Sequence, residues 1–177
     1  MFTEHTIESA PLAAQRSMTA IRDNWGYLPS AVARLANSPH TLDGFLKLNG
    51  IFESCTLDSL AREVLIMTIA TRNGCHLCVA IHTQRLTTMG ADDGLITALR
   101  NAAPLADPRL EALRVFTGRV LDTTGDVGEP DLRAFLAHGF TAQNALEVML
   151  GIGTYTLVTF ANRLTAAPLD EQLVPFA

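Results

Sequence analysis

Two cysteines and a histidine lie close together in the segment RNGCHLCVAIHTQR, residues 72–85. Cys75 and Cys78 are spaced as C-x-x-C, and His82 follows after three further residues. On an α-helix that begins near Gly74, these positions fall on one face, at i, i+3 and i+7. The spacing allows a disulfide between the cysteines and brings His82 close to the sulfur of Cys78. The segment is therefore a candidate redox site.

The position of the cysteines in this helix bears on their ionisation. Both are expected in the first turn, where the positive end of the helix dipole favours a thiolate. That position favours ionisation of Cys75, whereas a nearby His82 favours ionisation of Cys78. These arguments from the residues leave open which thiol has the lower pKa.

The preceding segment supplies a carboxylate. TLDSLAREVLIMTIAT predicts a helix over residues 56–72 with Thr56 as its N-cap, and the tight turn at Asn73-Gly74 predicts an antiparallel helix hairpin. Glu63 and His82 are each about nine residues from the turn centre, so they are expected side by side. Because the neighbours of Glu63 are mostly apolar, its carboxylate needs a buried partner, and His82 can be that partner.

These four residues predict a catalytic relay. Glu63 orients His82 and stabilises a positive charge on its ring. His82 then takes a proton from Cys78, and Cys75 is ready to form a disulfide. In this relay Cys78 is the nucleophile, His82 is the base and Glu63 is the acid that orients the base.

Three other interpretations use the same residues. The four side chains could bind zinc, although C-x-x-C within one continuous helix and a glutamate ligand are both unusual for structural zinc sites. Glu63 and His82 could be the acid and base of a lyase or isomerase that does not use the thiols. The cysteines could also be inert packing. A thioredoxin motif is not supported, because the sequence shows no βαβ unit.

The remaining sequence has a helical period and no convincing strand, so the predicted fold class is all-α. Capping residues, prolines and glycines predict helices over residues 29–36, 39–52, 56–72, 75–89, 93–100, 108–124, 129–138 and 141–164. The connections are short. We therefore expect one domain over residues 1–177, with N-terminal helices in 1–54, the C-x-x-C hairpin in 55–90 and C-terminal helices in 91–177.

Composition narrows the function classes. The chain has 177 residues, 48% of them apolar, and a net charge of −5. It has no run of lysine and arginine, which argues against a nucleic-acid partner. Its longest uncharged apolar stretch, residues 148–162, is too short to span a membrane. The first 15 residues carry acids and no apolar core, so we expect no secretory signal.

The three cysteines do not suggest a secreted disulfide framework, and a reducing cytoplasmic setting is expected. The mean hydropathy is positive, +0.21, and only 18% of the residues are charged. This balance predicts that helix faces are buried between subunits of a homo-oligomer.

The pattern Glu63-x11-Cys75-x2-Cys78-x3-His82 resembles the signature of the AhpD-like alkylhydroperoxidases, in the carboxymuconolactone decarboxylase superfamily. The spacing matches at all four positions. Residues 25–58 resemble the N-terminal part of the peroxidase-related branch. FTAQNALEVMLGIGTYTLVTFANRL resembles the last core helix of the family, including its asparagine at Asn162.

The resemblance implies an all-helical fold built on the hairpin and assembled as homotrimers or homohexamers. It implies thiol-dependent reduction of organic hydroperoxides, with Cys78 as the attacking thiolate, activated by His82 and Glu63. Cys75 would form the disulfide, and an external dithiol or lipoyl-type reductant would restore the pair. No metal, flavin, haem or other cofactor is implied. The decarboxylases of this superfamily use acid–base chemistry and do not rely on the cysteine pair, whose presence argues against that activity.

One position departs from the family. AhpD proper has a second histidine immediately before its second cysteine, and here that residue is Leu77. His76 lies one residue earlier, rotated by about 100° on the helix, so it is not assigned the same role. We expect His76 to be exposed at the mouth of the site, and Cys55 to be structural or incidental.

Overall fold

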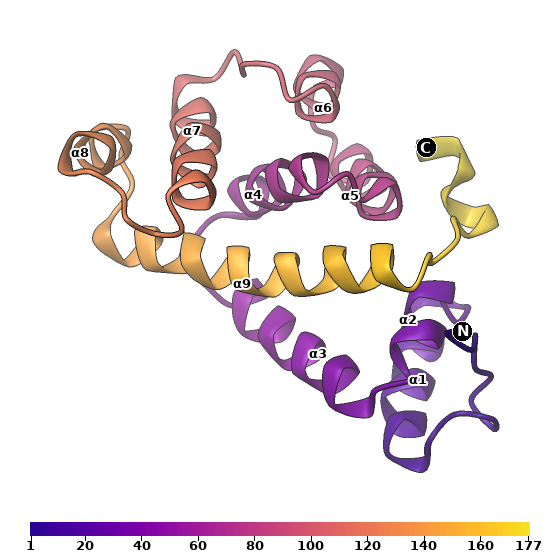
Figure 1. Ribbon diagram of the computed structural model, residues 1–177. Helices are drawn as coiled ribbons and strands as arrows, with labels where there is room; N and C mark the ends of the chain where they lie inside the picture. The colour runs from indigo at the N-terminus through magenta and orange to yellow at the C-terminus, as the bar shows by residue number, and fades with distance from the viewer.

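The computed structural model describes all 177 residues, which form nine α-helices, one short 3-10 helix and no strand (Figure 1). The predicted all-α fold is confirmed. The elements are α1 (Leu12–Trp25), α2 (Ser30–Leu35), α3 (Pro39–Glu53), α4 (Ser59–Arg72), α5 (His76–Thr88), α6 (Asp93–Arg100), α7 (Pro108–Asp122), α8 (Glu129–Ala137), α9 (Ala142–Leu164) and the 3-10 helix η1 (Glu171–Phe176).

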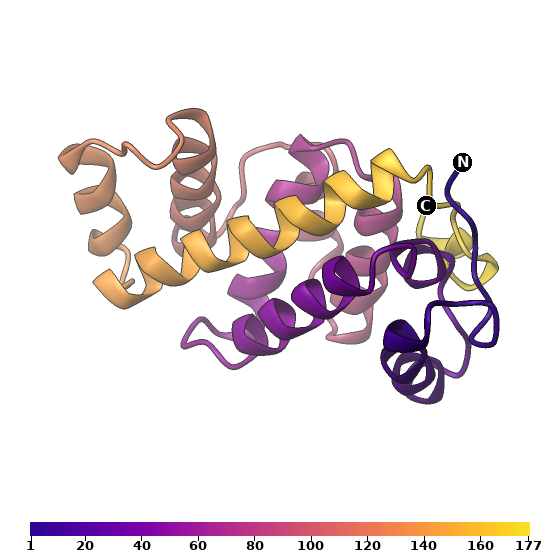
Figure 2. The same cartoon turned by 60° about the horizontal axis from the view of Figure 1, so that its bottom comes forward.

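The longest helix, α9, runs through the middle of the molecule. Figure 1 shows α4 to α8 on one side of it and α1 to α3 on the other. It packs against α3 and α4, and α4 in turn packs against α5 and α7. Figure 2 shows the same helix crossing the molecule diagonally, with α3 beside it. A capping box fixes its start: the Thr141 side chain accepts from the Asn144 amide, and the Asn144 side chain accepts from the Thr141 amide.

The predicted hairpin is confirmed, because α4 and α5 pack against each other across a tight turn. Gly74 has a φ of +62° in this turn, a left-handed conformation that suits glycine. The amide of Cys75 donates to the Ala70 carbonyl over 3.0 Å and closes the turn. The helix begins one residue later than predicted. Cys75 is its N-cap, with a φ of −89° and a ψ of 87°, and Cys78 lies in its first turn.

The predicted N-cap of α4 is wrong. Asp58 caps this helix, since its side chain accepts from the Ala61 amide over 2.9 Å. Thr56 has another partner: its amide and its hydroxyl both donate to the carboxylate of Glu147 on α9, over 2.9 and 2.7 Å. Thr56 therefore binds Glu147 of α9 instead of capping α4, and this contact holds the start of the hairpin against α9.

The first helix was not predicted. α1 follows Pro11 and ends at Gly26, which has a φ of +80°. Its buried residues are Ala14 and Met18, which pack in a small cluster with Leu42 of α3. The apolar side of α1 consists largely of small residues, so its helical period is faint in the sequence.

The core centres on α4, where nearly every side is covered. Its buried residues are Ala61, Glu63, Val64, Leu65, Ile66, Met67, Ile69 and Ala70. By contrast, α9 exposes an apolar stripe along one face, which includes Leu146, Met149, Phe160 and Leu164. The stripe follows helical spacing and extends over most of the length of α9. No helix of the chain combines the length and the apolar character that crossing a membrane requires.

Close packing of α9 against the core leads to a stability prediction. A Cβ added at Gly151 would lie 2.6 Å from Leu65 Cδ2 and 2.8 Å from Phe52 Cε2. Both neighbours are fully buried, so we expect Gly151→Ala to lower the free energy of unfolding by about 1–3 kcal/mol through overpacking. Chemical denaturation monitored by circular dichroism measures the change.

Gly50 of α3 offers a control outside the apolar stripe of α9. A Cβ at Gly50 would meet nothing within 4 Å, and this residue is exposed. Gly50→Ala should therefore raise the free energy of unfolding by about 0.5–1 kcal/mol through helix propensity alone. Equal effects of the two substitutions would contradict the packing of α9 described here.

Candidate active site

A buried hydrogen bond joins the two helices of the hairpin. Nδ1 of His82 on α5 donates to Oε2 of Glu63 on α4 over 2.6 Å. Glu63 is 3% exposed and His82 is 6% exposed, so water screens this pair weakly. The structure thus places these two residues side by side, as their equal distance from the turn indicated.

Arginines complete the environment of the carboxylate. Nε of Arg85, one turn beyond His82, lies 3.3 Å from Oε1 of Glu63. Burial by itself would raise the pKa of Glu63, but the charge and hydrogen bond of His82, followed by the charges of Arg85 and Arg62, outweigh it. The pKa of Glu63 therefore lies below its usual value, and the group is an ionised acceptor at neutral pH.

The two cysteines of the motif are both free and buried. Cys75 is 2% exposed and Cys78 is 4% exposed. The backbone amide of Cys78 donates to the sulfur of Cys75 over 3.4 Å. On the other side, Nδ2 of Asn162 on α9 donates to the sulfur of Cys78, also over 3.4 Å. The pair is in its dithiol form and is held between the start of α5 and the end of α9.

The two thiols differ in acidity. A hydrogen bond from the Cys78 thiol lowers the pKa of Cys75 to about 7, with help from the Cys78 amide, the Asn162 amide and the charge of Arg163. Burial opposes this shift. The pKa of Cys78 is raised, first because its thiol donates to Cys75 and then because it is buried beside the Cys75 charge. Cys75 is therefore the first thiol to ionise.

A small, largely apolar cavity of about 170 Å³ opens onto only one of the two sulfurs. Cys78 lines it, and Cys75 does not. Apolar side chains of α1, α2 and α3 form a large part of its wall, among them Trp25, Val32 and Phe45. A molecule in this cavity would meet the Cys78 sulfur in surroundings that contain little polar surface.

Six of the residues that line this cavity carry polar or ionisable side chains. They are Asn49, Cys78, His82, Arg85, Tyr155 and Asn162. The Tyr155 hydroxyl donates to Oδ1 of Asn49 over 2.8 Å, and the Tyr155 ring packs edge-on against the His82 ring with centroids 5.6 Å apart. Burial, followed by the charge of Glu53, raises the pKa of Tyr155, so its hydroxyl keeps its proton. His82 forms no hydrogen bond to Cys78, but both side chains line this one cavity.

Sequence reasoning missed three of these residues as parts of the site. Tyr155 and Asn162 are seven residues apart, which places them on one face of α9, and Arg85 follows His82 by three residues on α5. Asn162 was noted only as part of a family resemblance. Helical spacing from a known site residue could have suggested Arg85, whereas nothing local links the α9 residues to Cys78.

The other residues singled out in the sequence lie apart from this cavity. His76 is exposed as expected, but it does not line the cavity, so its expected place at the mouth is not found. Leu77 is buried and packs in a cluster with Leu173 of η1. Cys55 is half-buried, and burial raises the pKa of its thiol. None of these three residues lines the cavity.

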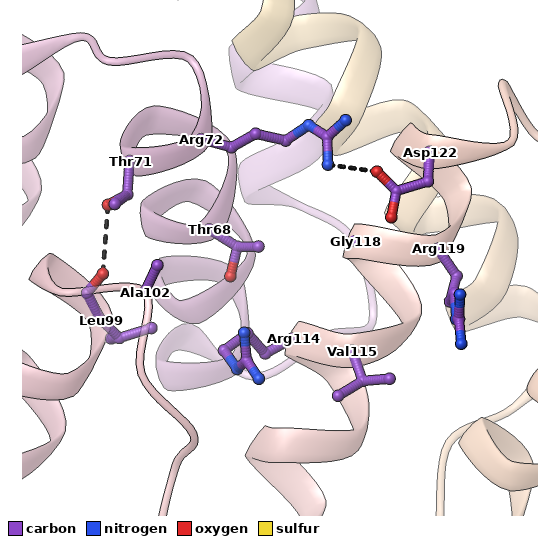
Figure 3. A pocket seen from close by; sticks show the side chains of 10 residues that line it. All are labelled: Thr68, Thr71, Arg72, Leu99, Ala102, Arg114, Val115, Gly118, Arg119 and Asp122. Carbon is purple, nitrogen blue, oxygen red and sulfur yellow. Dashed lines mark hydrogen bonds and ion pairs between the residues drawn. The ribbon is translucent and has the colours of Figure 1, made fainter.

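The geometry does not form a metal centre. No three histidine, cysteine, aspartate or glutamate side chains converge as metal ligands would, and His82 instead directs one ring nitrogen at Glu63. A second hollow, of about 460 Å³, lies between α4 and α7 (Figure 3). Its lining includes no cysteine or histidine, and within it Arg72 pairs with Asp122 over 2.6 Å.

Comparison with known proteins finds a family pattern in the central part of the chain. The pattern of the Carboxymuconolactone decarboxylase family matches residues 39–117, which extend from α3 into α7 and contain the whole hairpin. No protein with a curated function matches the sequence.

Solved structures share the fold at low sequence identity. The AhpD core of an uncharacterized peroxidase-related protein from Ralstonia eutropha JMP134 has a TM-score of 0.85 at 19% identity, covering 97% of this chain and 93% of that chain. An uncharacterized peroxidase-related protein from Silicibacter sp. TM1040 has a TM-score of 0.80 at 18% identity, covering 97% and 91%.

A third similar structure has a different activity in its name. The debrominase Bmp8 has a TM-score of 0.79 at 12% identity, covering 99% of this chain and 95% of that chain. At these identities the likeness establishes the fold and leaves the reaction open. The matched family pattern and the shared fold agree with the resemblance seen in the sequence. Residues 39–117 thus match the Carboxymuconolactone decarboxylase family, and the chain as a whole has the same fold as these AhpD-like structures.

Proposed function

We propose that this protein reduces small organic hydroperoxides through the thiols of Cys75 and Cys78. One observation carries this proposal: the sulfur of Cys78 faces an apolar cavity that is also lined by a histidine paired with a buried carboxylate. A second free cysteine, Cys75, lies next to it. A nucleophile, a base with its orienting acid, and a resolving thiol are thus in one place.

The proposed first half-reaction oxidises Cys78. His82, oriented by Glu63, takes the proton of the Cys78 thiol, and the thiolate attacks the terminal oxygen of the hydroperoxide. A sulfur–oxygen bond forms while the oxygen–oxygen bond breaks, and His82 returns the proton to the departing alkoxide. The products are a sulfenic acid at Cys78 and an alcohol.

The second half-reaction restores the site. Cys75 attacks the sulfur of the Cys78 sulfenic acid and forms a disulfide as the sulfur–oxygen bond breaks. The departing hydroxide takes up the proton that Cys75 has lost and leaves as water. An external dithiol, such as a lipoyl-type reductant, then reduces the disulfide by exchange and becomes a disulfide itself. The Cys78 amide, the Asn162 amide and the charge of Arg163 support this division of roles, because they lower the pKa of Cys75 and so favour the thiolate that attacks the sulfenic acid.

A second candidate reaction is reductive debromination. The fold similarity to the debrominase Bmp8, which has also been solved as a cysteine-to-alanine variant with 2,3,4-tribromopyrrole, favours testing it. The apolar cavity beside Cys78 also suits a flat halogenated ring. In that reaction the dithiol would supply two electrons, the carbon would exchange bromine for hydrogen, and bromide and the disulfide would be the products.

A free-thiol titration tests the redox proposal. The reduced protein is treated with a stoichiometric amount of tert-butyl hydroperoxide, and thiols are counted before and after. We expect rapid loss of the two motif thiols and their recovery with a dithiol. Cys78→Ser should abolish the reaction, and Cys75→Ser should stop it at a sulfenic acid that dimedone traps.

Cys55→Ser is the matched control, since this thiol lies outside the cavity. It should leave the thiol loss and turnover unchanged. Retention of full turnover by Cys78→Ser would overturn the proposal. Catalysis that survives loss of both motif cysteines would instead favour acid–base chemistry by Glu63 and His82.

The acidity of Cys75 gives a pH prediction. Because its pKa is lowered to about 7, thiolate absorbance should rise with pH around neutrality, well below the pH at which an ordinary thiol ionises. Cys75→Ser should remove this step from the titration, whereas Cys55→Ser should leave it in place. A single ionisation above pH 8.5, the approximate pKa of a free thiol, would contradict the arrangement.

We also propose that the protein is a homotrimer or homohexamer in which the exposed apolar stripe of α9 is buried between copies of the chain. Phe160 is 58% exposed and lies in this stripe. Light scattering should show an oligomer for the wild type, and Phe160→Glu should weaken or dissociate it, because burying a charge there is unfavourable.

Leu12→Glu provides a control for this prediction. Leu12 is 84% exposed but lies on α1, outside the stripe. This variant should keep the mass of the wild type. A wild type that is monomeric at micromolar concentration would disprove the assembly, and equal dissociation by both variants would disprove the role of α9.

A further inference from the structure

Asn162, one of the residues that line the cavity, has a buried side-chain oxygen without a hydrogen-bond partner. Its side chain lines the cavity with Cys78 and His82, and the residue is 4% exposed. Nδ2 donates to the Cys78 sulfur over 3.4 Å, which fixes the orientation of the amide. Oδ1 is buried and accepts no hydrogen bond from any group of the protein.

A buried amide oxygen without a partner is unfavourable, and most buried polar atoms in proteins have one. Two other buried side-chain oxygens lack a partner, Thr156 Oγ1 and Asp170 Oδ2, but neither residue lines this cavity. Of these three oxygens, only that of Asn162 belongs to a residue that lines the cavity with Cys78. A hydrogen-bond donor on a substrate in the cavity would satisfy it.

We propose that Oδ1 of Asn162 accepts a hydrogen bond from the O–H group of the hydroperoxide and so aligns it for attack by Cys78. This inference rests on the proposed function and names the group that selects the substrate. Nδ2 holds the sulfur while Oδ1 of the same amide holds the oxygen that the sulfur attacks. One planar group thereby fixes both reacting atoms.

The chemistry of the step agrees with this placement. The terminal oxygen carries its hydrogen throughout the transfer, since the sulfur–oxygen bond forms as the oxygen–oxygen bond breaks. His82 gives its proton to the departing alkoxide. The hydrogen bond to Oδ1 therefore persists from the bound hydroperoxide to the sulfenic acid of Cys78, and Asn162 never needs to gain or lose a proton.

The other polar groups of the cavity are already engaged. Oδ1 of Asn49 accepts from the Tyr155 hydroxyl over 2.8 Å. Nδ1 of His82 is hydrogen-bonded to Glu63, and in the proposed function the second ring nitrogen of His82 transfers the proton. Arg85 has no acceptor. Asn162 thus supplies the free acceptor, and the cavity favours reducible molecules that carry a hydrogen-bond donor next to the bond that breaks.

The test compares two reagents on one thiol. Cys55→Ser with Cys75→Ser leaves Cys78 as the only thiol of the full chain. On this background, Asn162→Leu removes both polar atoms with little change of volume. Rate constants are measured by stopped flow with tert-butyl hydroperoxide, which has a donor, and with methyl methanethiosulfonate, which has none. The pH is raised until each rate reaches its plateau, so that differences in thiol ionisation cancel.

We expect Asn162→Leu to lower the plateau rate constant with the hydroperoxide by roughly tenfold to a hundredfold. The plateau rate constant with the thiosulfonate should fall by less than about threefold. The apparent pKa of Cys78 should rise equally with both reagents, because the sulfur loses its amide donor. A selective effect of this kind does not arise from general disturbance of the fold. Asn162→Ala removes the same acceptor and gives the same comparison should the leucine variant fail to fold.

Thr154→Val is the matched control on α9. Thr154 is fully buried, its hydroxyl donates to the Leu150 carbonyl, and it does not line the cavity. Both plateau rates should stay as on the parent background. Equal losses with the two reagents in Asn162→Leu, or no loss with the hydroperoxide, would overturn the role of Asn162 alone. A parent protein that reacts with the thiosulfonate and not with the hydroperoxide would overturn the proposed function and this inference together.

Discussion

The buried bond between Glu63 and His82 sets the register of the whole site. A carboxylate with 3% exposure among apolar side chains is tolerable only with a charged or hydrogen-bonding partner. The partner is on the other helix of the hairpin, so α4 and α5 cannot slide past each other without exposing or stranding this charge. With that register fixed, Cys75 comes to the start of α5 and Cys78 to the face that His82 shares.

The second constraint is the close approach of α9 to this hairpin. Gly151 lets α9 lie against Leu65 of α4 and Phe52 of α3. Near the turn, Nδ2 of Asn73 donates to the Thr159 hydroxyl over 2.9 Å and holds the far half of α9 in place. The side chains that α9 then presents include Tyr155 and Asn162, which both line the cavity. Helix packing far from the sulfur thus determines what surrounds it.

The sequence predicted what local spacing determines and missed what packing determines. The pairing of Glu63 with His82 followed from counting residues out from a tight turn, and the C-x-x-C spacing placed two thiols together. Asn162 contacts Cys78 across 84 residues of chain, and no periodicity encodes such a contact. Thr56 shows the same limit, because a distant carboxylate took the hydroxyl that local rules assign to a helix cap.

The cavity opens onto the sulfur of Cys78, whereas Cys75 has the more acidic thiol. This difference suits both halves of the proposed cycle. The cavity reaches only Cys78, so both a peroxide and a dithiol that enter there meet that sulfur. Thiol–disulfide exchange is faster when the expelled thiol has a low pKa. Attack on Cys78 of the disulfide expels Cys75, and the Cys78 amide, the Asn162 amide and the charge of Arg163 still lower the pKa of Cys75 when Cys78 has no thiol proton to donate. The more acidic thiol, Cys75, is therefore better suited to be the resolving thiol and leaving group than to be the thiol that meets the substrate.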